Sequence, residues 1–455
     1  MQARQLCLLS LIFAFSTLPL AALDVSSVKQ GAMVKHGNSW ELRSEFGAPV
    51  REGARLLLRA DNGGVSINPI TADKVSCLVI LRVYASNEAE ARSLFDKFQL
   101  SARSVESGGV YLSSESPRRR HGQSLRVQFQ ITTPQRFNLD VETQGGDITV
   151  EAPLEGEARL TTAGGDVRTS DVTGPVRIET AGGGIEVGKI GGDLTARTAG
   201  GSIHVGNAKG DVILETSGGE IVTGTVTGAL RAETAGGDVV VGGASGKVEA
   251  RTAGGQIQIG PTGGSVRAET AGGSIRLQGA RGRVVAETAG GSIDLLQAES
   301  AVRATTAAGR ILAELNCTPK SFGASQLETS MGDVYVYLPG NVPITIDAAI
   351  DTAAGRQIHS DFPLDIQGDK EELVPSTLHG RGALNGGGEV LRIRTVAGNI
   401  EIRKIDEASL RELQQREDSK WKAWQDRRDE KDQRRLELEK ERRQRQQERD
   451  DDHDQ

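Results

Sequence analysis

The chain has 455 residues with a formal net charge of −7; 25% of its residues are charged and 4% are aromatic. The small net charge excludes a general electrostatic attraction to nucleic acid. The low aromatic content and the 57 glycines exclude a large aromatic core and favour thin, turn-rich β structure.

Residues 1–22 are expected to be an export signal. Arg4 provides a basic start, residues 6–15 form an apolar run, and residues 19–22 are a plausible cleavage region. The run is short for a membrane span, although a retained N-terminal anchor stays an alternative. No later apolar run approaches twenty residues, so no transmembrane segment is expected after cleavage. We therefore expect an exported protein of the periplasm, the cell surface or the extracellular space.

Residues 23–140 are predicted to form a β-rich capping region with one helix. Leu56, Leu58 and the segment 61–67 indicate a strand, a turn and a second strand, an early copy of the repeat described below. Apolar residues at helical spacing predict a helix over about 87–100, with Ser86 or Asn87 as its cap. The segments 78–83 and 125–131 are predicted to be strands.

Residues 141–315 carry a strict repeat of eighteen residues. Its marker is the phrase T-A-G-G, whose threonine recurs at Thr162, Thr180, Thr198, Thr216, Thr234, Thr252, Thr270, Thr288 and Thr306. A fixed period of this kind predicts a solenoid in which each coil buries its apolar side against its neighbours. Each coil is expected to hold two short strands joined by two glycine turns.

Alternation within the strands divides each coil into an inner and an outer side. Leu230, Ala232 and Thr234 are predicted to point inward, whereas Arg231 and Glu233 point outward. The paired glycines indicate either positive φ angles or an approach between coils too close for a Cβ atom. The threonine hydroxyls are expected to bond to a turn backbone or to the next threonine of the stack.

The period loosens over residues 316–405 and ends before the tail. Thr329 and Thr352 follow at intervals of twenty-three residues, residues 361–388 are expected to be irregular, and residues 391–402 restore the motif as a final coil. The tail, residues 406–455, is rich in charges of both signs and is predicted to be a lone charged helix or a disordered segment. It lacks a sustained coiled-coil heptad, although Trp421 and Trp424 are candidates for docking a partner.

No catalytic, cofactor-binding or metal-binding residue is predicted. The residues after the glycine pairs form a half-uncharged column that cannot supply a calcium ladder: Asp166, Gly184, Ser202, Glu220, Asp238, Gln256, Ser274 and Ser292. Cys77 and Cys317 are expected to be buried, unpaired thiols, because many coils separate them. The outward residues that vary between coils form a possible binding column: His204, Val222, Val240, Gln258 and Arg276.

The repeat T-[AS]-G-G-x-[IV]-x-[IV], the segment 334–339 after a T-S-x-G-D turn, and the closing segment 394–400 resemble a bacterial family. Its members are exported β-strand-repeat proteins of unknown function, commonly labelled adhesins. The resemblance covers roughly residues 50–403 and implies an all-β, single-chain β-solenoid. It also implies a role as an adhesin or as an envelope binding or structural protein, whose partner would be a cell-surface glycan or protein.

Two other functions stay open at this point. One is a polysaccharide-active β-helix enzyme that uses the mixed polar groups of the irregular segment, which are His359, Asp361, Asp365, Glu371, Glu372, His379 and Arg381. The other is an envelope scaffold that assembles by end-to-end stacking of solenoids. We expect a non-enzymatic binding or structural protein without a cofactor.

Overall fold

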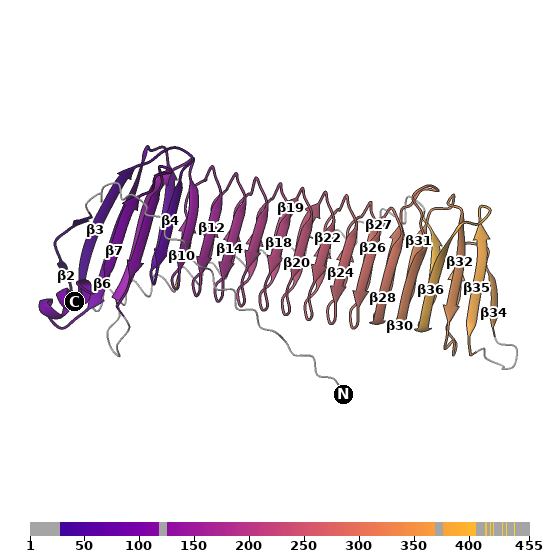
Figure 1. The fold of residues 1–455 in the computed structure, drawn as a ribbon. Helices are drawn as coiled ribbons and strands as arrows, with labels where there is room; N and C mark the ends of the chain where they lie inside the picture. Colours follow the sequence, from indigo (N-terminus) through magenta and orange to yellow (C-terminus); the bar gives the residue numbers. More distant parts are fainter. Residues whose placement is uncertain are drawn as a thin grey trace, which may run out of the picture.

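The computed structural model describes residues 28–117, 125–368 and 376–405, together with six single residues of the tail. Of the described residues, 55% lie in strands and 4% in helices, and they form an elongated rod (Figure 1). Two long sheets, here called sheet A and sheet B, run along the rod and enclose the core. The predicted β-solenoid is confirmed. The expected export signal (residues 1–22) lies outside the described residues, as does the tail apart from those six.

Every regular coil gives one strand to each sheet. Sheet B contains β10 (Asn138–Thr143), β12 (Ala158–Thr162), β14 (Val176–Thr180), β16 (Leu194–Arg197), β18 (Val212–Glu215), β20 (Leu230–Glu233), β22 (Val248–Arg251), β24 (Val266–Thr270), β26 (Val284–Thr288) and β28 (Val302–Ala308). Sheet A contains β11 (Ile148–Val150), β13 (Val167–Thr169), β15 (Ile185–Val187), β17 (Ile203–Val205), β19 (Ile221–Val226), β21 (Val239–Ala244), β23 (Ile257–Ile259), β25 (Ile275–Leu277), β27 (Ile293–Ala298) and β29 (Ile311–Leu315). Neighbouring strands are parallel, and Leu230 pairs with Val248 one period later.

A third row of inward residues closes the corner after each sheet A strand. Single parallel bridges link residues one period apart, from Leu154 and Val172 at one end to Ala280 and Ala298 at the other. These residues are buried, and Leu154 and Ala298 are fully so. Each coil therefore buries a row of side chains at this corner in addition to the inward residues of its two strands.

The threonine column fastens each turn to the preceding coil. The hydroxyl of Thr234 donates to the carbonyl of Gly219 at 2.8 Å and accepts from the backbone N–H of Gly237 at 3.3 Å. The same pair of bonds recurs in the coils from Thr162 to Thr288. Of the two expected partners, the turn backbone is therefore the one used. These bonds satisfy groups that would otherwise be buried without partners.

The N-terminal cap extends both sheets beyond the first regular coil. Sheet A gains β1 (Lys29–Gln30), β2 (Val34–His36), β3 (Ser39–Pro49), β6 (Lys74–Tyr84), β9 (Leu125–Pro134) and β5 (Gly64–Ile70), and sheet B gains β7 (Gln99–Ser104), β8 (Val110–Glu115) and β4 (Arg55–Ala60). The coil formed by β4 and β5 lies between β8/β9 and β10/β11. The predicted early copy of the repeat is thus a coil held on both sides.

Helix α1 (Glu88–Phe95) is shorter than the predicted helix over 87–100. Asn87 caps it as expected, because its side chain accepts from the backbone N–H of Glu90 at 3.0 Å. The helix ends at Phe95 because Gln99 and Leu100 pair with β8 as part of β7. Tertiary strand pairing overrides the helical spacing there.

The C-terminal end of the solenoid, like the N-terminal cap, contains a coil that is held between two others. It contains β30 (Ser325–Met331), β31 (Val334–Leu338), β32 (Ile344–Ile350), β33 (Ile358–Ser360), β34 (Asp365–Gly368), β35 (Leu378–Leu384), β36 (Glu389–Ala397) and β37 (Ile400–Lys404). Strand β36 lies between β30 and β32, and β37 lies between β31 and β33. The coil predicted to be final is therefore final in sequence but internal in space.

Two other expectations for this end are wrong. Thr329 is followed in the threonine column by Thr395 and not by Thr352, because β36 is inserted next to β30. The segment 361–388 is not irregular throughout, since β34 and β35 pair as antiparallel strands within it.

Both thiols match the prediction: Cys77 and Cys317 are buried and free, and burial raises their pKa values to about 12 and about 11.

Candidate functional site

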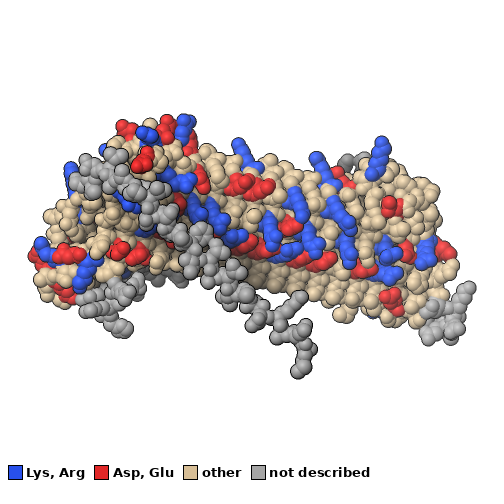
Figure 2. Space-filling view, viewed as in Figure 1, with Lys and Arg blue, Asp and Glu red and all other residues tan. Residues whose placement is uncertain are grey.

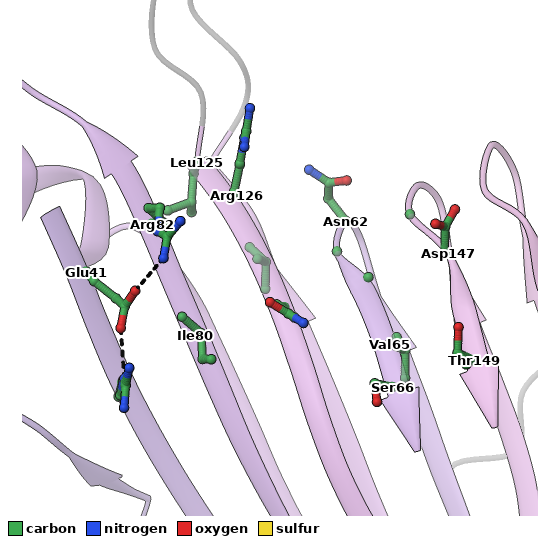
Figure 3. Close-up of a pocket in the computed structure, with 16 residues that line it drawn as sticks. Glu41, Asn62, Val65, Ser66, Ile80, Arg82, Leu125, Arg126, Asp147 and Thr149 are labelled. Atoms are coloured by element: carbon green, nitrogen blue, oxygen red, sulfur yellow. Dashed lines mark hydrogen bonds and ion pairs between the residues drawn. The ribbon is translucent and has the colours of Figure 1, made fainter. Parts of the chain in front are cut away.

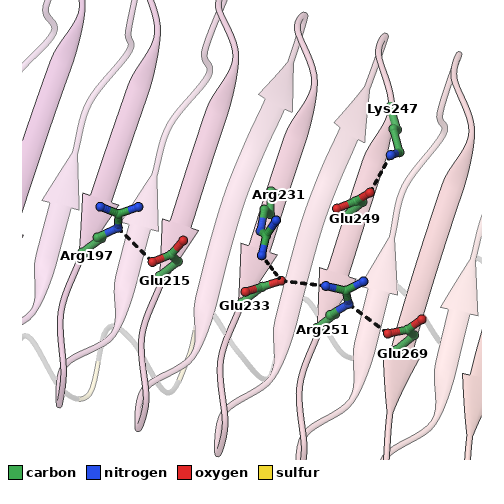
Figure 4. Close-up of polar contacts among 8 residues, drawn as sticks. All are labelled: Arg197, Glu215, Arg231, Glu233, Lys247, Glu249, Arg251 and Glu269. Atoms are coloured by element: carbon green, nitrogen blue, oxygen red, sulfur yellow. Dashed lines mark hydrogen bonds and ion pairs between the residues drawn. The ribbon is translucent and has the colours of Figure 1, made fainter. Parts of the chain in front are cut away.

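The outer face of sheet B neutralises its own charges. Basic and acidic side chains alternate along this face of the rod (Figure 2). The guanidinium of Arg251 binds Glu233 at 3.1 Å and Glu269 at 2.9 Å, one coil away on either side (Figure 4). Arg197 and Glu215 pair in the same way at 2.8 Å. The hydrogen bond with Glu269 raises the pKa of Arg251, and ion pairs of this kind link neighbouring coils along sheet B.

The outer face of sheet A carries the predicted binding column. Strand pairing places His204, Val222, Val240, Gln258 and Arg276 in one continuous row. Their accessibility differs sharply, because Val240 is 2% exposed and Gln258 is 4% exposed. Nε2 of His204 lies 3.3 Å from Glu220, and Arg276 binds Asp294 at 3.3 Å. The column therefore exists as a row but does not present five open side chains.

A groove of about 780 Å³ hollows the same face near the N-terminal cap (Figure 3). It crosses β3, β6, β9, β5 and β11. Its lining side chains are mainly hydrogen-bonding groups, among them Arg43, Asn62, Ser66, Arg82, Arg126, Gln128, Asp147 and Thr149, with Ile80 as an apolar member. Such a groove suits a polar, hydroxyl-rich or anionic ligand.

One carboxylate positions two of the groove's arginines. Glu41 is 4% exposed and accepts from Arg43 at 2.8 Å and from Arg82 at 2.9 Å. Burial alone would raise the pKa of Glu41, but the hydrogen bonds from Arg82 and Arg43 outweigh burial and hold that pKa below its ordinary value. Glu41 is therefore an ionised anchor for guanidinium groups, and its environment is the opposite of the one that a general acid needs.

The row of charged groups in this groove has no signature in the sequence. Antiparallel pairing places Glu41 opposite Arg82, and Arg82 opposite Arg126, although the three are far apart along the chain. The guanidinium of Arg126 also lies over the ring of Tyr84, 5.9 Å from its centroid. The alternation predicted over residues 125–131 places Arg126 on the outer face of its strand. It does not identify Arg82 and Glu41 as the residues beside it on the neighbouring strands.

A smaller groove of about 180 Å³ continues the polar surface toward the regular coils. It is lined by Asp166, Arg168, Glu186 and His204, among others. Arg168 binds Asp166 at 2.9 Å and lies 3.6 Å from Glu186. His204, a member of the predicted column, thus lies in this groove.

The polar groups proposed for an enzyme are divided between the two sheets. His359 lies on β33 of sheet A, whereas His379 and Arg381 lie on β35 of sheet B. Asp361 accepts from Arg403 at 3.3 Å, and Arg381 binds Asp347 at 3.1 Å. Glu371 and Glu372 lie outside the described residues. Asp365 on β34 lies opposite Arg381 on β35 and near His379, whereas His359 and Asp361 lie beside β37 of sheet A, so the described members form two separate groups.

The aspartates of the glycine turns hold neighbouring coils together. Asp166 accepts from the backbone N–H of Gly184 at 2.8 Å, and Asp238 accepts from that of Gln256 at 2.8 Å.

Within the described ranges, no group of three or more His, Cys, Asp or Glu residues is placed to hold a metal ion. Among those same residues, no helix is long and apolar enough to cross a membrane.

Comparisons with known proteins give only remote likenesses. No protein-family model matches the chain, and no curated protein matches it. A solved structure described as a "putative adhesin" from Bacteroides fragilis NCTC 9343 is 13% identical, covers 52% of this chain and 95% of its own, and has a TM-score of 0.27. One described as a "putative cell adhesion protein" from Clostridium sporogenes ATCC 15579 is 9% identical, covers 80% and 100%, and has a TM-score of 0.14. Likenesses this remote carry no argument about the present chain.

Proposed function

We propose that the protein is an exported, non-enzymatic β-solenoid that binds a polar ligand on the outer face of sheet A, as an adhesin or as an envelope binding protein. The observation that carries the proposal is the groove of about 780 Å³ with guanidinium groups along one side. Arginine binds carboxylate, sulfate and hydroxyl-rich groups through several parallel hydrogen bonds. An acidic cell-surface glycan is the ligand class that fits these groups best.

The rod supplies a rigid support for this groove. Antiparallel pairing of β3, β6 and β9 and parallel pairing of β9, β5 and β11 fix the strands that carry the lining residues. Sheet B offers a poorer surface for an anionic ligand, because there one guanidinium, that of Arg251, is shared between two carboxylates, whereas in the groove Arg43 and Arg82 share the single carboxylate of Glu41. The ligand is therefore expected at the N-terminal end of sheet A and not along the flank of the rod.

The two alternatives receive less support. The polar groups proposed for glycan hydrolysis are split between two sheets. End-to-end assembly needs long open edge strands, but the C-terminal edges are β33 with three residues and β34 with four. Short edge strands oppose such pairing.

The test is binding of the purified full chain to a panel of acidic and neutral polysaccharides, measured by calorimetry at low and high salt. The variant carries Arg126→Ser and Gln128→Ala, two exposed residues of the groove. Its control is Arg159→Ser, an exposed arginine on β12 of sheet B. Loss of one charged hydrogen bond and one neutral bond should weaken binding by about 10- to 100-fold. Binding to no member of the panel, or equal loss in the control, would overturn the proposal.

A further inference from the structure

Two arginines face each other across neighbouring strands of the groove. Antiparallel pairing places Arg82 on β6 directly opposite Arg126 on β9, and both side chains lie on the outer face of sheet A (Figure 3). The Cβ atoms of such a pair are about 4.5–5.5 Å apart, and like charges placed opposite each other destabilise a sheet. The protein therefore holds two positive charges together at a cost in stability, which is typical of a binding site.

A second arginine pair shows that this arrangement alone does not define a site. Arg159 on β12 lies opposite Arg177 on β14, on the outer face of sheet B. Neither lines the groove, and Arg177 binds Glu179 on its own strand. Arg82 and Arg126, in contrast, both line the hollow of about 780 Å³. A ligand that enters this hollow can therefore reach both guanidinium groups at once.

Each guanidinium of the groove pair is held by a different neighbour. Arg82 donates from Nη2 to the carboxylate of Glu41 at 2.9 Å, yet its side chain is 42% exposed. Since a guanidinium has five N–H groups, this bond leaves donors of Arg82 for a ligand. The guanidinium of Arg126 lies over the ring of Tyr84, 5.9 Å from its centroid. The π face of Tyr84 attracts this cation and restrains it beside Arg82.

The groove itself shows how a carboxylate binds between two of its arginines. Glu41 accepts from Arg43 at 2.8 Å and from Arg82 at 2.9 Å. Along the sheet, Glu41 lies opposite Arg82, and Arg82 lies opposite Arg126. Arg82 thus has a carboxylate on one side and a guanidinium on the other. A carboxylate from a ligand would restore the alternation of charge between Arg82 and Arg126.

The opposite side of the groove offers acceptors for hydroxyl groups. Asp147 and Thr149 line this side, and Thr149 lies on β11. One oxygen of Asp147 accepts from the backbone N–H of Asp166 at 2.9 Å, and the residue is exposed. Strand β5 lies between β9 and β11, so two strand spacings, about 10 Å, separate the two sides. A single sugar ring does not span this distance, whereas a disaccharide does.

We propose that Arg82 and Arg126 form a clamp for one carboxylate, and that the ligand is a carboxylated oligosaccharide of at least two sugar residues. Its carboxylate binds at β6 and β9, and hydroxyl groups of a neighbouring sugar bind Asp147 and Thr149. Glu41 and Tyr84 are positioning residues, because they act on the ligand through the two arginines. This inference rests on the proposed function of the groove and adds the chemical group that the groove selects.

Calorimetry of the full chain with matched polysaccharides tests the clamp. The probes are polygalacturonate, alginate and hyaluronate, each also in its neutral, carboxyl-reduced form, together with dextran sulfate. The native protein should bind at least one carboxylated polymer about 10-fold or more tightly than the reduced form. Arg126→Gln should weaken binding of that polymer by about 10- to 100-fold and change binding of the reduced form by less than about twofold. The control is Arg159→Gln, from the arginine pair of sheet B, which should keep the native preference.

Two further residues separate positioning of the clamp from contact with sugar hydroxyls. Tyr84 is 39% exposed, so its substitution leaves the core intact. Tyr84→Ser should weaken binding of the carboxylated polymer alone, by about 2- to 5-fold, and Tyr84→Phe should restore it because the ring is kept. Thr149→Val removes one hydroxyl and should weaken the carboxylated and reduced forms alike, by about 2- to 10-fold. Circular dichroism checks that each variant is folded.

Failure of the clamp can be distinguished from failure of the proposed function. If the native protein binds none of the probes, the proposed function is overturned, and the clamp with it. If the native protein binds and Arg126→Gln keeps the preference for the carboxylated form, the clamp alone is overturned. Tighter binding of dextran sulfate than of every carboxylated polymer would overturn selection of a carboxylate. Equal weakening by Tyr84→Ser and Tyr84→Phe would overturn positioning by the ring, and unchanged binding by Thr149→Val would overturn the two-sugar footprint.

Discussion

The turn glycines allow a sharp test of how the coils are held together, because two neighbours in one turn face very different surroundings. A Cβ atom on Gly255 would lie 2.0 Å from the carbonyl oxygen of Gly237 in the preceding coil. A Cβ atom on Gly254 would lie 3.4 Å from the carbonyl oxygen of Gly236. Neither glycine has a φ in the left-handed region. Gly255→Ala and Gly254→Ala therefore differ in the space available and not in backbone strain.

The expected magnitudes follow from these distances. Gly255→Ala must push two coils apart by about 1 Å, and overpacking of this kind costs about 1–3 kcal/mol. It also disturbs the bond from Thr270 to the carbonyl of Gly255 at 2.8 Å and the bond from the N–H of Gly255 to Thr252 at 3.2 Å, which adds about 1–2 kcal/mol. We expect Gly255→Ala to lower the free energy of unfolding by about 2–5 kcal/mol. The free energy of unfolding of Gly254→Ala should stay within about 1 kcal/mol of the native value. The alanine lowers the entropy of the unfolded chain, and this gain offsets its close contact with the carbonyl oxygen of Gly236.

The assay is urea unfolding of both variants, followed by far-ultraviolet circular dichroism and by hydrogen exchange of the affected turn. Stacked repeats are coupled mainly to their neighbours, so Gly255→Ala should also accelerate exchange in the coils on either side. Equal destabilisation by the two alanines would refute the reasoning, since it would mean that the approach of the coils does not limit these positions.

Three further predictions concern the ladder, the thiols and the groove. Thr252→Val keeps the shape of a buried residue but removes its hydroxyl, and we expect a loss of about 1–3 kcal/mol in urea unfolding; an unchanged midpoint would contradict the role of the ladder. Because burial raises the pKa of Cys77 to about 12 and that of Cys317 to about 11, their contribution to stability is present below about pH 9 and is lost as the pH rises through these values. Alkylation by iodoacetamide at pH 8 should accordingly be slow until urea unfolds the chain, and rapid labelling of the native protein would contradict the burial. Arg82→Ala should cost about 1–3 kcal/mol near pH 7 because it leaves a buried carboxylate with one guanidinium. The lowered pKa of Glu41 means that the native protein has this stabilisation above about pH 4.5 and loses it as the pH falls further; equal stability of variant and native protein at pH 7 would refute the anchor role.

The repeat itself could be predicted because its pattern is local and periodic. A residue and its partner in the next coil are separated by a constant number of positions, so the inward side of Leu230 and Ala232 applies to every copy. The threonine and glycine turns were identified for the same reason. What remained open was which of two constraints the glycines meet, and the structure shows that it is close approach of the backbones.

The ends and the candidate site required the tertiary structure. Insertion of β36 and β37 between earlier coils, and of β4 and β5 at the other end, joins strands that are distant in sequence and carry no pairing signal. The row from Glu41 to Arg126 arises from the same kind of long-range register.

The sequence by itself therefore determined the solenoid, its period and the side of the strand on which each residue lies, because these depend on backbone geometry that repeats within a coil. Only the tertiary structure decided which outward residues meet solvent. Val240 was predicted to be an open position of the binding column, yet it is buried. Alternation tells which way a side chain points, but burial depends on what else in the folded molecule lies over it.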